Sequence, residues 1–404
     1  MALHCLAAVA RCCRVQPLPL SSAAAGLPAV QAALISGKTM RGGPKSWIKE
    51  PWPYKERPYR GLKSFFDTTR SRWDENTRLI VVEGPPAAGK EVVARALAEE
   101  FEMQYMPAAS GDLVYINDYG YDLRQLNDKL PHKLKLLQID DFLKNPYDSR
   151  MGSFQINWFE FKLSQYIDAL AHLMNTGQGV VMNKCVLSDF VYMEAMCNAG
   201  FVSRGVRSVY REIAQQCMPF LQRPHLVVYL DIPVAEVQKR IKARARPSEV
   251  GSPALTDQFL QSLEATYKES WLKSISEHSE VLTYDVSQET IVEHMVDDIE
   301  KLNFEQYGFQ TDKMSDWNRK SDDEWDACRT QYTNYKDHLM HNMLVPRFDV
   351  PELMAEQEDM KVFYELYHET APGQKYRFGF NPSMGDSVLF KLGDGGKYRD
   401  TTKY

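Results

Sequence analysis

The sequence predicts an α/β protein with a parallel five-stranded sheet flanked by helices, an N-terminal arm and an irregular C-terminal extension. Short apolar runs rich in β-branched residues alternate with longer segments of helical character, which is the pattern of strand–helix–strand units. A Gly-containing turn joins the first such run to the helix after it. The expected strands are residues 79–82, a short strand ending near 107, 179–182, 226–230 and 281–284. The expected helices are residues 92–101, 154–174, 189–197, 207–217, 234–246, 254–275 and 289–302, with loops and short helices over 109–150.

The composition of the chain argues against two classes of protein, general nucleic-acid binders and membrane-spanning proteins. The 404 residues carry a formal net charge of −6, so nothing favours general binding to nucleic acid. No run reaches the 18 or so apolar residues that span a bilayer, and membrane association would be peripheral, through a partner. The seven cysteines include no C-x-x-C pair, which indicates reduced thiols and predicts neither a disulfide framework nor a metal site.

The N-terminal segment is poor in acidic residues. No Asp or Glu precedes Glu50, whereas Arg11 and Arg14 lie among alanines and serines. This composition is typical of a mitochondrial transit peptide, which we place at residues 1–40. A secretory signal is the competing interpretation, but its positive charges would precede the apolar run at 3–10, and here they follow it. A tail without a targeting role is the third possibility.

Two further segments differ in character from the α/β region. Residues 41–77 are rich in Pro, Trp, Tyr and Lys and are expected to form an extended arm, because each proline restricts the residue before it. Residues 303–404 carry many aromatic and charged side chains with little periodicity. We expect this extension to lie across its own domain or to dock on a partner, which leaves residues 78–302 as the folded P-loop domain.

A phosphate-binding loop follows the first expected strand. In this motif, backbone N–H groups at a helix N-terminus hold phosphate, the lysine reaches the β- and γ-phosphates, and a Ser or Thr after the lysine holds Mg²⁺. Here that last position is Glu91, a longer side chain that adds negative charge beside phosphates. The candidate phosphate-binding residues of the loop are Gly84, Ala87, Ala88, Gly89, Lys90 and Glu91. The alternative is a Gly-containing turn that binds nothing.

A basic cluster after the fourth expected strand supports the same site. Arg240 and Arg244 are four residues apart and share a helix face, and Arg246 follows. Guanidinium forks match phosphate oxygens and can stabilise transferring charge. A solvated basic helix end, favoured by the helix dipole, would have the same sequence.

With these elements in this order, the chain resembles the deoxynucleoside kinase family, which implies a P-loop nucleoside-kinase-like fold. Three segments are similar to a branch of that family that serves as an accessory subunit of mitochondrial respiratory complex I, and the resemblance spans about 78–390. The segments are DALAHLMNTGQGVV (168–181), LSDFVYMEAM (187–196) and RPHLVVYLDIPVAEVQ (223–238).

The resemblance also implies that catalysis is lost. Active members of the family place Glu-Arg-Ser after the third strand, where this chain has Asn183, Lys184 and Cys185. They place a Glu general base after the second strand, where Ala108 lies in a stretch without a carboxylate. Their base-reading Gln is matched here to Asn157. We therefore expect no catalytic residue, no metal site, and a degenerate substrate site at Asn157, Asn183 and Lys184.

The function implied is that of an accessory, non-redox subunit of NADH:ubiquinone oxidoreductase in respiratory-chain electron transport. It would support assembly and stability from the matrix side of the mitochondrial inner membrane, with other complex I subunits as its partners. No cofactor is required, and the expected occupant of the pocket, where there is one, is ATP, ADP or a deoxynucleotide. Two alternatives stay open: an active mitochondrial deoxynucleoside kinase that uses Asp112, Asp140 or Asp141 as a displaced base, and a nucleotide-responsive regulator.

Overall fold

The computed structural model describes residues 35–38, 50–59, 66–287, 292–307, 311–387 and 389. The predicted transit peptide, residues 1–40, lies outside the described residues except for 35–38, so its prediction stands untested. The described part of the arm, 50–59 and 66–77, contains one short 3₁₀ turn, Thr69–Arg72, and neither a strand nor an α-helix.

The predicted parallel sheet of five strands is confirmed. Its order is β2-β3-β1-β4-β5, and every pairing is parallel. All five residues of β1 are buried, since the central strand of a parallel sheet is covered on both faces. The strands are β1 (Leu79–Glu83), β2 (Gln104–Met106), β3 (Val180–Asn183), β4 (Leu226–Asp231) and β5 (Glu280–Asp285).

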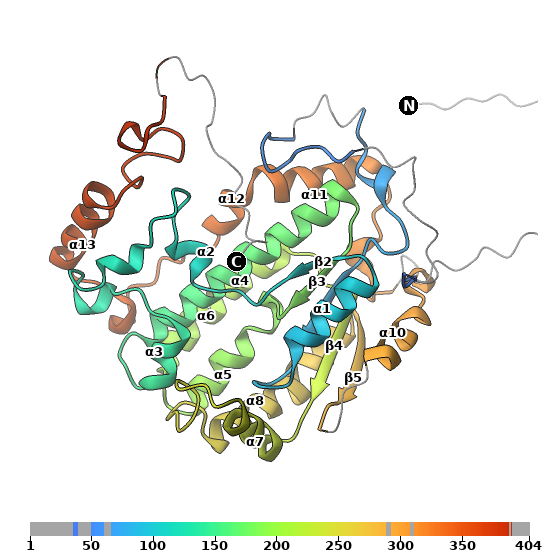
Figure 1. The fold of residues 1–404 in the computed structure, drawn as a ribbon, viewed down its shortest axis with the longest axis horizontal. Coiled ribbons are helices and arrows are strands. Elements are labelled where there is room, and N and C mark those ends of the chain that lie inside the picture. The colour runs from blue at the N-terminus through green and yellow to red at the C-terminus, as the bar shows by residue number, and fades with distance from the viewer. Residues whose placement is uncertain are drawn as a thin grey trace, which may run out of the picture. The chain divides into compact units, whose positions relative to one another are not determined.

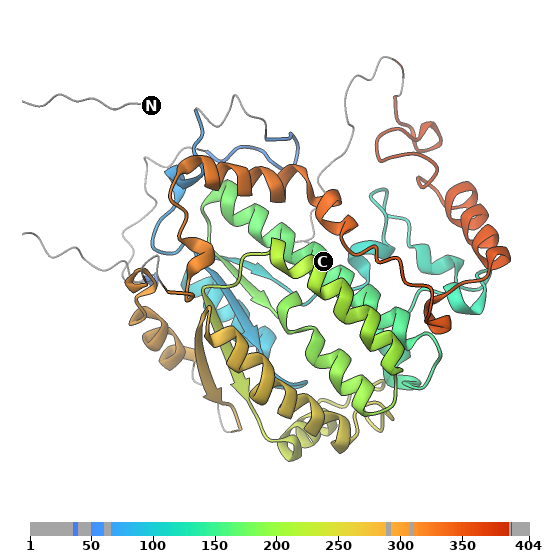
Figure 2. The same cartoon turned by 180° about the vertical axis from the view of Figure 1, so that it is seen from behind.

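Helices cover both faces of the sheet. Figure 1 shows α1 and α10 over one face, and Figure 2 shows the opposite face, covered by α4, α5, α6 and α8. The helices up to the last strand are α1 (Lys90–Glu100), α2 (Asp112–Tyr115), α3 (Ile139–Lys144), α4 (Met151–Thr176), α5 (Phe190–Asn198), α6 (Arg204–Cys217), α7 (Val234–Arg244), α8 (Asp257–Thr266) and α9 (Leu272–Ser276). After the sheet come α10 (Val292–Glu300), α11 (Asp322–Asn334), α12 (Lys336–His341) and α13 (Gln357–Tyr364).

One predicted helix is interrupted. The segment expected as a single helix over 254–275 consists of α8, a π-helical turn at Tyr267–Trp271 and α9. Such turns occur often at functional sites, because the extra residue redirects a side chain inward. Here the fully buried Tyr267 reaches the end of β1.

The prediction of an irregular C-terminal extension is wrong for residues 322–341, which form α11 and α12. Helix α11 packs along α4, and its Trp325, Cys328 and Tyr332 are buried at helical spacing. Its fully buried Arg329 donates to Asn175 Oδ1 at 2.8 Å and to Asp67 Oδ2 at 2.8 Å. A buried arginine within the apolar stripe is the reason the helical period is weak in the sequence.

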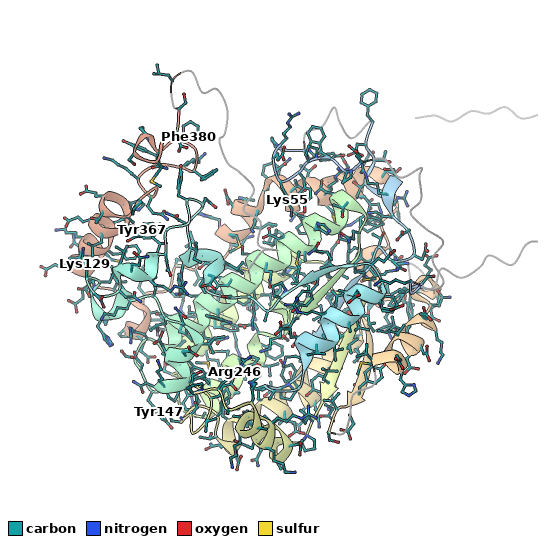
Figure 3. The ribbon with its side chains drawn as sticks, in the orientation of Figure 1. Lys55, Lys129, Tyr147, Arg246, Tyr367 and Phe380 are labelled. Carbon is teal, nitrogen blue, oxygen red and sulfur yellow. The ribbon has the colours of Figure 1, made fainter. Side chains whose placement is uncertain are left out.

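The end of the extension packs on a distant part of the chain. Leu123, Leu126, Leu130 and Ala371 form a small cluster separate from the main core. The π-helical turn Glu365–Thr370 lies against the 3₁₀ turn Leu123–Leu126 (Figure 3 labels Tyr367 of this region). Residues 357–386 and 116–130 therefore form a C-terminal lobe on the P-loop domain.

No helix of the described residues is long and apolar enough to cross a membrane.

Candidate functional site

The phosphate loop connects β1 to α1 and has the backbone of an anion-binding turn. Gly84, Ala87 and Gly89 have φ of 149°, 59° and 85°, so left-handed residues alternate with right-handed ones and the N–H groups converge. A Cβ on Gly84 would lie 2.6 Å from the Leu230 carbonyl oxygen, so close packing against β4 requires glycine there. The predicted loop residues are thus brought together, with Ala88 buried behind them.

Lys90 is buried at the start of α1. Its Nζ donates to the carbonyl oxygens of Gly84, at 2.9 Å, and Pro85, at 2.5 Å. Burial, followed by the positive charge of Lys184, lowers the pKa of Lys90 well below its ordinary value. Arg244 and Lys162 add to this effect, while Glu83 opposes it. The pocket therefore has an excess of positive charge, which an incoming phosphate would compensate.

Glu91 does not take the place of the missing hydroxyl. Its side chain is 59% exposed on the outer face of α1 and pairs with Arg95 at 3.0 Å. In this structure the side chain of Glu91 is therefore directed to Arg95, and only its backbone N–H is available to the loop, so a phosphate-binding role of Glu91 stays a prediction.

Each of the three predicted arginines after β4 already has a partner within the chain. Arg244 pairs with Glu249 at 2.5 Å, and Arg246 lies 3.7 Å from the same carboxylate. Arg240 donates to the Val286 carbonyl oxygen after β5. Figure 3 places Arg246 in the segment beyond α7. The charge of Arg244 reaches Lys90, so this arginine lies near the phosphate loop, and Glu249 occupies the donors that phosphate would use.

A buried carboxylate directly before the loop was not predicted. Glu83 ends β1, is fully buried, and accepts from Ser188 Oγ at 2.5 Å, Cys185 N at 2.9 Å and the Tyr267 hydroxyl at 3.1 Å. The sequence did contain a signal for Glu83, because a carboxylate at the end of an apolar strand, directly before Gly84, is expected to be buried. Glu83 ties the π-helical turn and the segment after β3 to the phosphate loop.

The predicted degenerate pair Asn183 and Lys184 does lie beside this network. Asn183 ends β3, is buried, and faces the Tyr105 hydroxyl without a well-formed hydrogen bond. Lys184 has a φ of 69° and donates to the Tyr192 hydroxyl at 2.7 Å. Neither side chain supplies negative charge to the site.

Asn157, the third residue predicted for the substrate site, is partly buried on α4, and its role stays a prediction. Two residues earlier, the Nε2 of Gln155 donates to Asp189 Oδ2 at 2.9 Å. Asp189 is fully buried and pairs with Lys162 at 2.5 Å. Asn157 lies two residues further along α4, so its side chain projects from a different face of the helix. Gln155 and Lys162 are seven residues apart, a helical spacing that could have indicated them.

Among the described residues, none of the positions considered for a general base holds a free carboxylate beside the loop. Ala108, after β2, is exposed, and the residue before it, Pro107, accepts a hydrogen bond from Gln165. The three displaced candidates serve elsewhere or face solvent: Asp112 pairs with Arg124 at 2.6 Å, Asp141 accepts from Gln138 N at 2.8 Å, and Asp140 is exposed.

The side chains at the two positions expected to hold Mg²⁺, Glu91 and Asn183, offer it neither a carboxylate nor a hydroxyl beside the loop. Mg²⁺ in phosphate sites takes one or two carboxylates or hydroxyls at fixed octahedral positions. Glu91 points outward, Asn183 is neutral, and the described residues contain no cluster of three His, Cys, Asp or Glu side chains that could hold a metal. The loop and Lys90 supply the groups with which such a turn holds phosphate.

The chain is similar to known proteins over most of its length. The deoxynucleoside kinase family matches residues 80–305. NADH dehydrogenase [ubiquinone] 1 alpha subcomplex subunit 10, mitochondrial, of Rattus norvegicus is 32% identical over 326 residues, 80% of this chain and 86% of that protein. Deoxyguanosine kinase of Dictyostelium discoideum is 21% identical over 236 residues, 58% of this chain and 73% of that protein. Among solved structures, deoxyadenosine kinase from M. mycoides with bound dATP is 16% identical with a TM-score of 0.40, covering 55% of this chain and 96% of that one.

Proposed function

This chain belongs to the deoxynucleoside kinase family, and we propose that it is an accessory, non-redox subunit of mitochondrial complex I that no longer transfers phosphate. In this role it supports the assembly and stability of NADH:ubiquinone oxidoreductase. It is a peripheral subunit, held by its neighbours on the matrix side of the inner membrane. Its phosphate loop is a remnant of the kinase site that can still hold a nucleotide.

The observation that carries the proposal is the extent of the likeness to the complex I subunit of the rat. That likeness covers 326 residues at 32% identity, whereas the family match stops at residue 305. The likeness to the kinase of Dictyostelium discoideum covers 236 residues at 21%. The likeness to the rat subunit is thus 100 residues longer than the family match over 80–305 (326 against 226 residues), and residues outside the kinase fold are the ones that a docking role would use.

The absence of turnover rests on three catalytic roles that the side chains do not fill. Glu91 faces away from the loop, Asn183 is neutral, and Ala108 stands where a base is needed. Loss of a general base alone typically costs about 10²- to 10⁴-fold in rate. Loss of metal charge neutralisation adds to this, because phosphoryl transfer depends on it. Binding survives these losses because it uses backbone N–H groups and Lys90.

The membership is tested on native gels of detergent-solubilised mitochondria. Cells depleted of the chain are rescued with the wild-type full chain, and the gel is stained for NADH dehydrogenase activity. We expect the chain to co-migrate with the active band and the band to weaken on depletion. Migration only as a free species, with an unchanged band, would overturn the proposal.

The absence of turnover needs a separate assay with purified chain, labelled ATP and each deoxynucleoside. The matched control is Lys90→Ala, which removes the charge within the phosphate loop. We expect equal background for both proteins. Saturable transfer by the wild type that Lys90→Ala abolishes would establish an active kinase instead.

A further inference from the structure

Helix α6 presents a stripe of arginines on the molecular surface. Its opposite side is apolar and buried, through residues such as Val206, Val209 and Ile213. The spacing of three and four residues therefore places one set of polar side chains on the outer face. This set is Arg204, Arg207, Ser208, Arg211 and Gln215.

A fourth arginine arrives from a distant part of the chain. The crossing segment, residues 342–350, leads from α12 towards α13 beside α6 (Figure 2). Its Arg347 donates to Glu212 Oε2 at 3.0 Å and is anchored by Asp349 at 2.7 Å. A Cβ on Gly205 would lie 3.2 Å from Val350, so glycine lets the crossing segment approach the helix closely. The guanidinium of Arg347 is thus fixed relative to the helical stripe.

These side chains line a surface hollow of about 650 Å³. The lining residues are Arg204, Arg207, Ser208, Arg211, Glu212, Gln215 and Arg347. The hollow contains no residue of the phosphate loop and none of the segment after α7. Four guanidinium groups line the hollow with the carboxylate of Glu212, and the carboxylates of Glu194 and Asp349 pair with three of them from its edge.

The nearby carboxylates orient the arginines and leave some of their N–H donors available. Glu194 accepts from Arg207 at 3.2 Å and from Arg211 at 2.7 Å. Each guanidinium carries five N–H donors in a planar fork, so each keeps donors for a further ligand. Among the described ion pairs, none involves Arg204, whose side chain is exposed. An excess of positive charge on a protein of net charge −6 marks a local preference for anions.

We propose that this hollow is a second anion site that binds a phosphate-bearing ligand, distinct from the phosphate loop. Arginine forks match phosphate oxygens with two parallel hydrogen bonds, a geometry that lysine cannot supply. Guanidinium groups from two chain segments surround the hollow, so a ligand with several phosphate oxygens can contact both. The same chemistry is offered by a soluble phosphate ester and by the headgroup of an anionic phospholipid. The site stands independently of the proposed role in complex I.

The test uses the purified full chain and two probes. Inositol hexakisphosphate represents a soluble phosphate ester, and its binding is measured by titration calorimetry at two salt concentrations. Phosphatidylcholine vesicles with and without phosphatidic acid represent a membrane headgroup, and their binding is measured by flotation. The variant is Arg204→Ala/Arg211→Ala. Lys239→Ala/Lys242→Ala removes the same charge from the exposed face of α7, and Lys90→Ala reports any binding at the phosphate loop.

We expect the arginine variant to lose affinity by about tenfold or more, since charge-assisted hydrogen bonds are the strong ones. The lysine controls should stay within about threefold of wild type, and added salt should weaken binding. Arg204→Lys/Arg211→Lys, which keeps the charge, should lose part of the affinity and thereby separates fork geometry from charge. Binding of the soluble probe alone identifies a phosphate ester, and binding of the acidic vesicles alone identifies a lipid headgroup.

Three results would overturn the second site. They are no binding of either probe by the wild type, equal losses in the arginine and α7 variants, and loss in Lys90→Ala alone. Both lysines and both arginines are exposed, and an unchanged melting temperature shows that a variant is folded. The native-gel test of complex I membership is unaffected by any of these outcomes.

Discussion

Arg329→Met tests whether α11 belongs to the core of the domain or is a detachable docking helix. Arg329 is fully buried, with its guanidinium 3.8 Å from the Tyr59 ring centroid. It donates to Asn175 on α4 and to Asp67 of the arm, so one side chain joins three segments. Methionine keeps the length of the side chain and removes both the charge and the donors.

The expected loss in the free energy of unfolding follows from the interactions that Asp67 and Asn175 each lose. Breaking a buried ion pair by removing one partner typically costs about 3–5 kcal/mol. Asp67 keeps a second arginine, Arg72, so the lower end of that range applies. Asn175 Oδ1 is buried and loses its charged donor, although the amide nitrogen keeps Ala171 and Thr333. We therefore expect a loss of about 3 kcal/mol in the free energy of unfolding.

A matched control joins the same two segments at the surface. Arg70 of the arm pairs with Asp322 at the start of α11 at 2.6 Å, and their side chains are 48% and 53% exposed. Exposed pairs contribute about 0–1 kcal/mol, so Arg70→Ala should have little effect. Urea unfolding of the full chain measures both, with tryptophan fluorescence as the probe, because Trp73 and Trp325 meet edge to face at this junction, with their ring centroids 4.6 Å apart. Equal stabilities of Arg329→Met and Arg70→Ala would refute the reasoning and leave α11 as a docking helix.

Three further changes probe the candidate site. Asp189→Asn leaves Lys162 buried with a neutral partner, and denaturant unfolding should show a loss of about 3–5 kcal/mol; a loss below about 1 kcal/mol would contradict the pairing. Glu249→Gln releases Arg244, so calorimetry should find nucleotide bound up to about fivefold more tightly, the scale of a partly exposed pair; weaker binding would show that Glu249 itself contacts the ligand. Because the pKa of Lys90 is lowered in the free pocket, bound phosphate should raise it again, and nucleotide binding should take up protons at a pH between the pKa values of the free and the bound state. Calorimetry in buffers of different ionisation enthalpy measures that uptake, which Lys90→Met should abolish; an equal uptake in the variant would assign it to another group.

Only part of the site could be predicted from the sequence, because its residues come from separate elements that are brought together only in the folded protein. The phosphate loop could be located, since seven consecutive residues between a strand and a helix specify its backbone. Glu83, Lys162 and Asp189 come from β1, α4 and the start of α5, and no local pattern brings them together. The carboxylate of Glu249 that holds the arginines lies in an irregular loop, where side-chain direction has no sequence signal.

The sequence by itself determined the five strands, most of the helices and the phosphate loop, because strand and helix periodicity and the loop motif are local properties. Only the tertiary structure decided the strand order, the contact of Gln155 with Asp189, and the helical state of α11. Each of these depends on contacts between residues far apart in the chain. Helix α11 is the clearest case: a charged residue interrupts its apolar stripe, and Arg329 can be buried there only because Asp67 and Asn175 meet it from two other segments.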